Sequence, residues 1–389
     1  EQQPENNVYR ILVEMLAVTL SKKARARAVQ LPAWNEALGL PRPWDQQWSM
    51  RMQQIMAFET DLLEYEDLFE GNQVVEAKVE SLKASARYEL ETIETQGGAL
   101  NAIDYMKSRL VESNTDRLQN IESNVTTVVG VNKFTKTEKS PLVSGDGGIM
   151  TVDPAVEKDQ IDRLNQWRTN RNKKLVNKAL LSLRQAALHG KNIMLPSIEA
   201  AKAGATTGEW AQEMRNIYGE YRGPTGVATG ISNKTDGLDE LRSAVDAVSD
   251  KLGERLKFLM GKPGLDGHSN GAEQIASRAR DCGMKIEYQG IRLTPQELVE
   301  SVKSTKAHVV GLSILSGSHL PLVQDMINLL AKEGLTKIPI VVGGIIPEED
   351  KLKLLEMGIS KVYTPKDFEM NTIMMDIVNL AEPKEIAAE

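Results

Sequence analysis

Apolar and polar positions follow two alternating patterns along the C-terminal part of the chain. Short apolar or β-branched runs are typical of strands, and spacings of three or four residues between apolar positions are typical of helices. The strand pattern occurs at 255–260, 286–290, 308–315, 338–344 and 359–363, and the helix pattern at 271–282, from Thr294 onward, and at 320–333, 347–357 and 370–381.

Strands that alternate with helices form parallel sheets covered by helices on both faces. We therefore expect an α/β C-terminal domain with a five-stranded parallel sheet in the flavodoxin-like order 2-1-3-4-5. The helix that follows the second strand has a clear start, since Thr294 and Glu297 have capping-box spacing and Pro295 stands at the first helical position.

The first 220 residues favour helices instead. One strand is predicted there, at 125–134 (VTTVVGVNKF), because the segment is β-branched and bounded by polar residues. Segments rich in Gly, Ser, Lys or Pro at 136–154 and 219–237 predict linkers. Helices are predicted at 7–22, from a cap at Asp45 to about Leu63, from Val74 to Gly97-Gly98, at 100–112, as a pair over 155–189, and at 207–218.

The amino-acid composition mainly excludes several classes of protein and site. The 389 residues carry a formal net charge of −7, which disfavours a general nucleic-acid binder because phosphate binding needs an excess of Lys and Arg. Cys282 is the only cysteine, so an internal disulfide and a thiolate metal cluster are excluded. No apolar run predicts a membrane span, and we expect a reducing, cytoplasmic-type compartment. Since Glu1 stands where an initiator Met would be, we expect a processed or truncated chain.

Small and polar residues follow the predicted strands, at the edge where open parallel sheets bind ligands. A histidine, His268, stands in the loop after the first strand, and strand-end glycines allow a ligand to approach the backbone closely. The candidate ligand-binding residues are Lys262, Asp266, Gly267, His268, Ser269, Asn270, Gly271, Ser313, Ile314, Leu315, Gly343, Gly344, Tyr363, Thr364 and Pro365.

The ordered set D-x-H-x-x-G at 266–271, S-x-L at 313–315 and Gly-Gly at 343–344 resembles the cobalamin-binding signature of the methylmalonyl-CoA mutase and methionine synthase group. The resemblance implies that His268 is the lower axial ligand of cobalt. It implies that Asp266 accepts the other ring N–H, that Lys262 partners Asp266, and that Ser313 and the glycines line a slot for the displaced nucleotide tail.

The first half of the chain resembles the end of the (β/α)8 substrate barrel of adenosylcobalamin-dependent acyl-CoA mutases, with LPAWNEALGLP at 31–41 and VVGVNKF at 128–134. We expect barrel residues at 1–135, a helical linker region at 136–240 and a cobalamin-binding domain at 241–389. Glu36 matches the family's glutamate near the deoxyadenosyl ribose; the alternative interpretation is a carboxylate that the helix dipole favours at a helix start.

The resemblance implies a radical rearrangement of a branched acyl-CoA, and GHSNGAEQIA and LSILSGSH are nearer to ethylmalonyl-CoA than to methylmalonyl-CoA mutases. The substrate-side catalytic residues would lie upstream, so none is assigned in this chain, and a homodimer is implied for the full enzyme. Two alternatives stay open: a cobalamin-binding subunit or carrier that serves a separate catalytic chain, and a cobalamin-dependent regulator, for which no output module is found.

Overall fold

The computed structural model describes residues 3–138, 150, 153–225, 238–315, 318–364, 366–367 and 369–383. Its main feature is a five-stranded sheet in the order β2-β1-β3-β4-β5, in which every strand pair is parallel. The predicted α/β fold and strand order are therefore confirmed. The strands are β1 (Lys257–Gly261), β2 (Lys285–Tyr288), β3 (Val309–Ser313), β4 (Ile340–Gly343) and β5 (Lys361–Tyr363).

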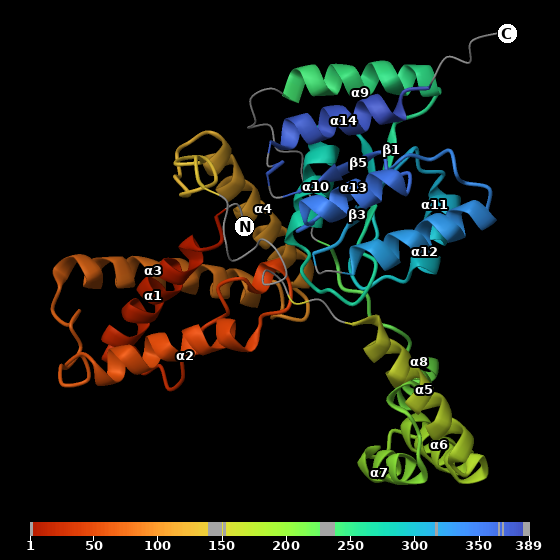
Figure 1. Cartoon of the computed structure of the whole chain (residues 1–389), viewed down its shortest axis with the longest axis horizontal. Helices are drawn as coiled ribbons and strands as arrows, with labels where there is room; N and C mark the ends of the chain where they lie inside the picture. Colours follow the sequence, from red (N-terminus) through yellow and green to blue (C-terminus); the bar gives the residue numbers. More distant parts are fainter. Residues whose placement is uncertain are drawn as a thin grey trace. The chain divides into compact units, whose positions relative to one another are not determined.

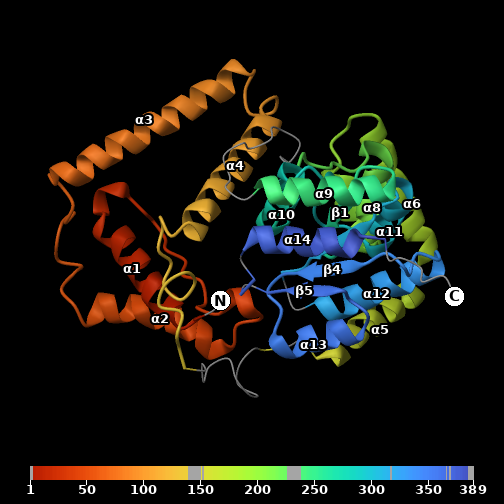
Figure 2. The ribbon, with the colours of Figure 1, turned by 90° about the horizontal axis from the view of Figure 1, so that it is seen from above.

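Helices cover both faces of this sheet (Figure 1). Seen from above, α9 and α14 lie on one side of the sheet, and α12 and α13 lie on the other (Figure 2). The first face packs against α9 (Leu238–Leu252), α10 (Asn270–Asp281) and α14 (Met370–Ala381), and the second against α11 (Pro295–Thr305), α12 (His319–Lys332) and α13 (Glu348–Glu356).

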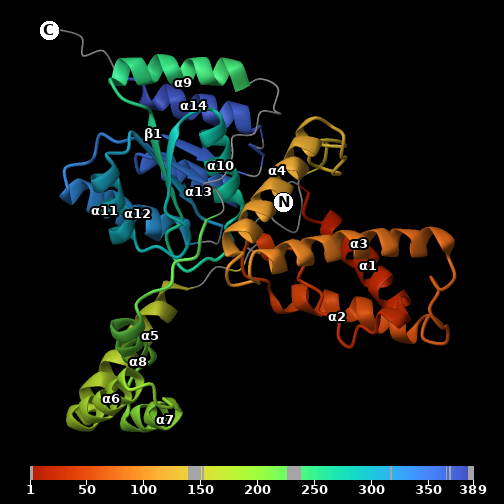
Figure 3. The same cartoon turned by 180° about the vertical axis from the view of Figure 1, so that it is seen from behind.

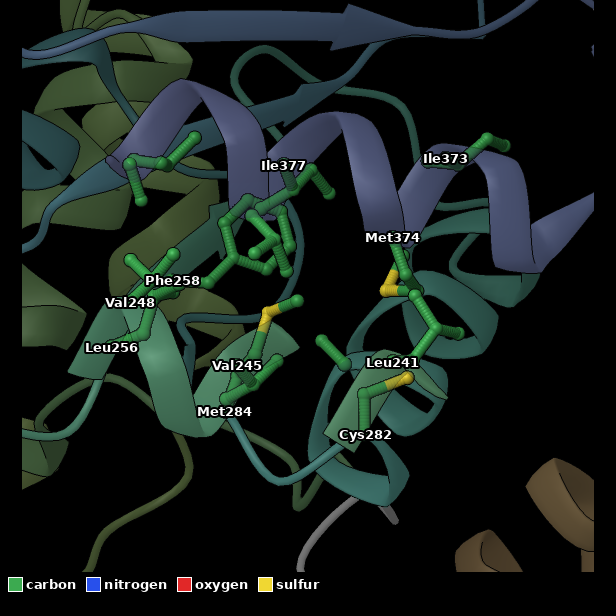
Figure 4. Packing of buried hydrophobic residues seen from close by; sticks show 14 of the residues in the cluster. Leu241, Val245, Val248, Leu256, Phe258, Cys282, Met284, Ile373, Met374 and Ile377 are labelled. Carbon is green, nitrogen blue, oxygen red and sulfur yellow. The ribbon is translucent and has the colours of Figure 1, made fainter. Parts of the chain in front are cut away.

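The alternation of side chains along β1 divides the core into two clusters. Phe258 joins the cluster under α9 and α14, while Leu259 joins the cluster on the opposite face, and both are fully buried. Figure 4 shows Phe258 close to Ile377 of α14 and to Val245 of α9. Each such side chain contributes about 1.5–3 kcal/mol by leaving water, so both faces hold the sheet in place.

The N-terminal segment is helical. The helices are α1 (Asn6–Leu20), α2 (Pro43–Phe58), α3 (Gln73–Thr95) and α4 (Ile103–Glu122), with short 3-10 turns at Lys22–Ala24 and Glu36–Leu38. Helix α4 extends ten residues beyond the predicted end at 112. Among the described helices, none is both long and apolar enough to cross a membrane.

The strand predicted at 125–134 is wrong, because this segment forms turns. The side chain of Asn132 accepts a hydrogen bond from the Val128 amide and donates to the carbonyls of Ile121 and Thr126. Gly130 adopts a left-handed φ of 82°. The Asn132 side chain thus makes hydrogen bonds with backbone groups that, in a strand, would pair with a neighbouring strand. These hydrogen bonds outweigh the β-propensity of the valines.

Asp45 takes part in the cap of α2, as predicted, but from inside the helix, where it is the third residue. Its side chain is fully buried and accepts hydrogen bonds from the Arg42 backbone amide, Trp34 Nε1 and Asn35 Nδ2. Burial opposes ionisation of the carboxyl, but the hydrogen bonds from Arg42, Asn35 and Trp34 outweigh it and lower the pKa of Asp45.

Residues 151–223 form a separate compact unit of helices (Figure 3). The predicted pair over 155–189 and the helix at 207–218 are confirmed. The Arg171 side chain forms an ion pair with Glu209, and Trp167 Nε1 donates to the Gly204 carbonyl. The unit contains α5 (Pro154–Asn170), α6 (Lys173–Leu188), α7 (Met194–Ala203) and α8 (Thr207–Tyr218), of which α7 was not predicted. The predicted linkers lie largely outside the described residues.

Candidate functional site

The loop after β1 presents one imidazole to solvent. The side chain of His268 is 80% exposed, and its Nδ1 lies 2.7 Å from Oδ1 of Asp266. The same carboxylate oxygen accepts a hydrogen bond of 3.0 Å from the His268 backbone amide. Because a neutral imidazole that donates from Nδ1 keeps its lone pair on Nε2, this arrangement leaves Nε2 as the nitrogen that can bind a metal.

Lys262 is the buried cation that pairs with the Asp266 carboxylate. Its ammonium is 1% exposed, lies 2.9 Å from Oδ2 of Asp266 as an ion pair, and donates a hydrogen bond of 3.1 Å to the Ser313 carbonyl. The Ser313 hydroxyl lies 3.4 Å from the same nitrogen. Lys262 therefore links the His268 loop to the end of β3, and the predicted pairing of Lys262 with Asp266 is present.

The charge state of Asp266 follows from these partners. Burial alone would raise its pKa, but hydrogen bonds from the His268 backbone and ring and from Lys262 outweigh burial and lower the pKa to about 2. The carboxylate is therefore ionised at neutral pH. An ionised acceptor raises the basicity of the imidazole that donates to it, and this favours binding of a metal at Nε2.

The loop after β2 also holds the His268 loop, which the sequence did not predict. The Gly264 amide donates to the Leu293 carbonyl, and the Leu293 amide donates to the Lys262 carbonyl. Leu265, which lies between Lys262 and His268 in the same loop, is 92% exposed. No periodic pattern predicts that Leu265 is exposed. Its place between small and polar residues was the only hint in the sequence.

The residues after His268 lead directly into α10. Ser269 stands at the position before the helix, Asn270 is its first residue, and a Cβ added to Gly271 would meet no atom within 4 Å. A Cβ added to Gly267 would lie 3.2 Å from Nη2 of Arg292, a residue of the loop after β2. The loop after β2 thus lies against this segment at Gly267, and space is left at Gly271.

The ends of β3 and β4 meet at backbone distance. A Cβ added to Gly344 would lie 1.9 Å from the carbonyl oxygen of Ile314, whereas one added to Gly343 would meet only the Tyr363 side chain, at 3.9 Å. Gly344 is therefore required for packing between the two strand ends, whereas a Cβ at Gly343 would make only an ordinary van der Waals contact. Leu315, which follows Ile314, is half-buried.

The end of β5 contributes a hydroxyl on each of two residues. Tyr363 donates a hydrogen bond of 3.2 Å to Asp376. The pKa of Tyr363 is raised, mainly by burial and secondly by the negative charge of Asp376. Thr364 is buried, and its amide and hydroxyl donate to the Asp367 carboxylate. Pro365, also predicted here, lies outside the described residues.

The contrast between the two glycines gives a stability prediction. Gly344→Ala is expected to lower the free energy of unfolding by about 1–3 kcal/mol, because its methyl group overlaps the Ile314 carbonyl. Gly343→Ala, the matched control, is expected to change it far less. Urea unfolding of both variants measures the difference. Equal losses in the two variants would contradict a close backbone approach at Gly344.

Glu36 begins the 3-10 turn Glu36–Leu38 and is exposed. The other histidines have structural partners: His319 is buried, with Nε2 2.9 Å from Asp350, and His308 accepts the Lys257 amide. Cys282 is fully buried, and burial raises the pKa of its thiol to about 11.

Comparison with known families decides what this site belongs to. The sequence model described as methylmalonyl-CoA mutase matches residues 1–220, and the one described as B12 binding domain matches residues 256–366. The chain belongs to the methylmalonyl-CoA mutase family. Members of this family are isomerases, and the sheet with its His268 loop lies in the B12 binding domain.

Ethylmalonyl-CoA mutases share a higher sequence identity with this chain than methylmalonyl-CoA mutases do. The chain is 65% identical over 389 residues to the ethylmalonyl-CoA mutase of Cereibacter sphaeroides and 57% identical over 385 residues to that of Methylorubrum extorquens. It is 30% identical over 391 aligned positions to the methylmalonyl-CoA mutase of Escherichia coli. These alignments cover 100%, 98% and 98% of this chain but only 60%, 56% and 54% of the relatives.

Proposed function

We propose that this chain binds adenosylcobalamin and provides the cofactor-binding part of an ethylmalonyl-CoA mutase that forms methylsuccinyl-CoA. Methylmalonyl-CoA to succinyl-CoA is the second candidate reaction, and the higher identity to ethylmalonyl-CoA mutases favours the first. The observation that carries the proposal is the exposed His268 ring, held through Nδ1 by an ionised Asp266 so that Nε2 is free to bind cobalt.

Each strand-end residue has a proposed role. His268 would bind cobalt through Nε2, and Asp266 and Lys262 would fix the tautomer and orientation of its ring. Ser313, which carries a hydroxyl at the strand end, is proposed to contact the nucleotide tail. Glu36 is proposed to accept hydrogen bonds from the deoxyadenosyl ribose. The tail slot is proposed to be lined by Gly267, Ser269, Asn270, Gly271, Ile314, Leu315, Gly343, Gly344, Tyr363, Thr364 and Pro365.

The bound cofactor supplies the radical that starts the rearrangement, and the protein supplies position and exclusion of water. Residues 1–135 are proposed to complete the substrate barrel, 136–240 to connect it, and 241–389 to hold the cofactor. We further propose a homodimer in the cytoplasm for the full-length enzyme, with an acyl-CoA as its substrate.

Turnover tests this proposal. Because the chain spans only about 60% of the Cereibacter sphaeroides relative, we expect no turnover of ethylmalonyl-CoA by this chain alone. Turnover is expected when the remaining 40% of that relative's length is supplied on the same or a separate polypeptide. Conversion of ethylmalonyl-CoA by the chain alone would contradict the expectation that part of the active site lies on the remaining 40% of the enzyme. Activity with an unrelated partner would favour a cobalamin carrier.

A further inference from the structure

Helix α10 buries an unusual number of polar side chains for a helix of 12 residues. Charged side chains are almost never fully buried in proteins unless they are paired. Their spacing of three or four residues places them along one side of the helix. These residues are Glu273, Gln274, Ser277, Arg278 and Asp281, each no more than 6% exposed.

Helix α4 supplies the partners at the first turns of α10, and the two helices lie side by side in Figure 3. Lys107 Nζ lies 2.8 Å from Oε1 of Glu273, whose side chain is 5% exposed. The Gln274 side chain accepts a hydrogen bond from the Thr115 hydroxyl and donates to the Val111 carbonyl. A buried carboxylate and a buried amide of α10 thus depend on α4 for their hydrogen bonds.

A second ion pair of opposite polarity completes the contact. The Arg278 guanidinium lies 3.6 Å from the Glu122 carboxylate, and it donates a hydrogen bond to Asn371 of α14. Glu122 also accepts a hydrogen bond of 3.4 Å from the Met370 amide at the start of α14. The end of α4 is therefore held between α10 and α14.

The order of the charges fixes the direction of α4. The cation Lys107 meets the anion Glu273, and fifteen residues later the anion Glu122 meets the cation Arg278. If α4 were reversed, like charges would meet at both ends. Like charges in contact at this partly buried surface would repel each other, so the pattern favours one direction of docking.

The first turn of α10 joins this contact to the candidate cofactor site. Helix α10 begins at Asn270, two residues after His268, and the Glu273 amide donates to the Ser269 carbonyl. Glu273, which pairs with Lys107, lies in that same turn. A displacement of α4 would remove the partner of a buried charge in the first turn of α10, five residues after His268.

We propose that Lys107 and Glu122 of α4 are positioning residues for the cobalamin site, which they hold in place through α10. The inference rests on the proposed cobalamin binding by His268. It goes further, because it makes cofactor affinity depend on a helix that lies within the match to the mutase family model and outside the match to the B12 binding domain. Cofactor affinity would therefore depend on whether α4, within residues 1–220, is packed against α10.

A charge exchange tests the inference in the complete chain. Lys107→Glu is expected to raise the dissociation constant of hydroxocobalamin on the order of tenfold, within the usual range of coupling between sites. The double variant Lys107→Glu with Glu273→Lys is expected to recover most of that loss. Visible absorption during titration measures both. Lys83→Glu, which removes an exposed ion pair with Glu80, is the control and is expected to bind like the unmodified chain.

Hydrogen exchange without cofactor gives an independent measurement. The amides of 270–274 are expected to exchange faster in Lys107→Glu and to regain protection in the double variant. If Lys107→Glu does not fold, Lys107→Met replaces it in both measurements. Unchanged affinity and unchanged exchange in the single variant, or a double variant no better than the single, would overturn the inference. Failure of the unmodified chain to bind cobalamin would instead overturn the proposed function.

Discussion

His268→Ala is expected to abolish histidine ligation of cobalt and to weaken cobalamin binding by more than a hundredfold. The outer partners of a metal-binding histidine each contribute about 10–100-fold to affinity, so loss of the ligand itself should exceed that range. The structure shows no second imidazole in the loop to replace it, since the described histidines His189, His308 and His319 have partners elsewhere.

Paramagnetic resonance of the bound cob(II)alamin form measures this ligation directly. With natural-abundance protein, the axial nitrogen splits each cobalt line into three, and with ¹⁵N-histidine protein it should split each line into two. The change is expected in the unmodified chain and absent in His268→Ala. His319→Ala is the control and should keep it. If the splitting is insensitive to the label in the unmodified chain, the cofactor retains its own base and His268 is not the ligand.

Lys262→Met is expected to lower the free energy of unfolding by about 3 kcal/mol, because it leaves the Asp266 carboxylate without its buried cation. Urea unfolding measures the loss. The control is Lys257→Met in the same strand, where the partner Glu254 is 44% exposed and solvent screening makes the expected loss much smaller. The double variant with Asp266→Asn should lose less than Lys262→Met alone, since no unpaired charge remains. A larger loss in the double variant would contradict the ion pair.

The acid dependence of stability follows from the same group. The pKa of Asp266 is lowered in the folded state from 3.8 to about 2, so its contribution is complete above pH 4 and is lost as pH falls through 2. That contribution is about 1–2 kcal/mol after allowance for solvent screening. In Lys262→Met the pKa of Asp266 is expected to rise, so that the acid transition shifts to higher pH. Urea midpoints between pH 2 and 6 show the shift, and identical profiles would contradict it.

The sheet was predictable because local patterns and topology agree. The largely apolar runs at β1, β3 and β4 indicate strands buried on both faces. The capping box at Thr294 marks a helix start, which the structure confirms because the Glu297 amide donates to the Thr294 hydroxyl. The pairing of Asp266 with His268 was also predictable, since only one residue separates them.

Contacts between distant segments could not be predicted in the same way. The pairing of Lys107 with Glu273 joins residues 166 positions apart, and neither residue differs locally from a solvated surface charge. The turn at 125–134 depends on the position of one side chain, Asn132, which strand propensity ignores. Helix α9 is not among the predicted helices, although Leu238, Leu241 and Val245 have helical spacing.

The burial of Cys282 has a practical consequence for spectroscopy of this protein. Maleimide reagents require an accessible thiolate, and the only thiol of the chain is enclosed beneath α9 and α14 with a pKa raised to about 11. A cysteine introduced at an exposed position of the His268 loop, as in Leu265→Cys, would therefore take up a fluorescent dye selectively, with the natural thiol left in place. Quenching of that dye by the strongly absorbing corrin would then follow cofactor arrival in real time.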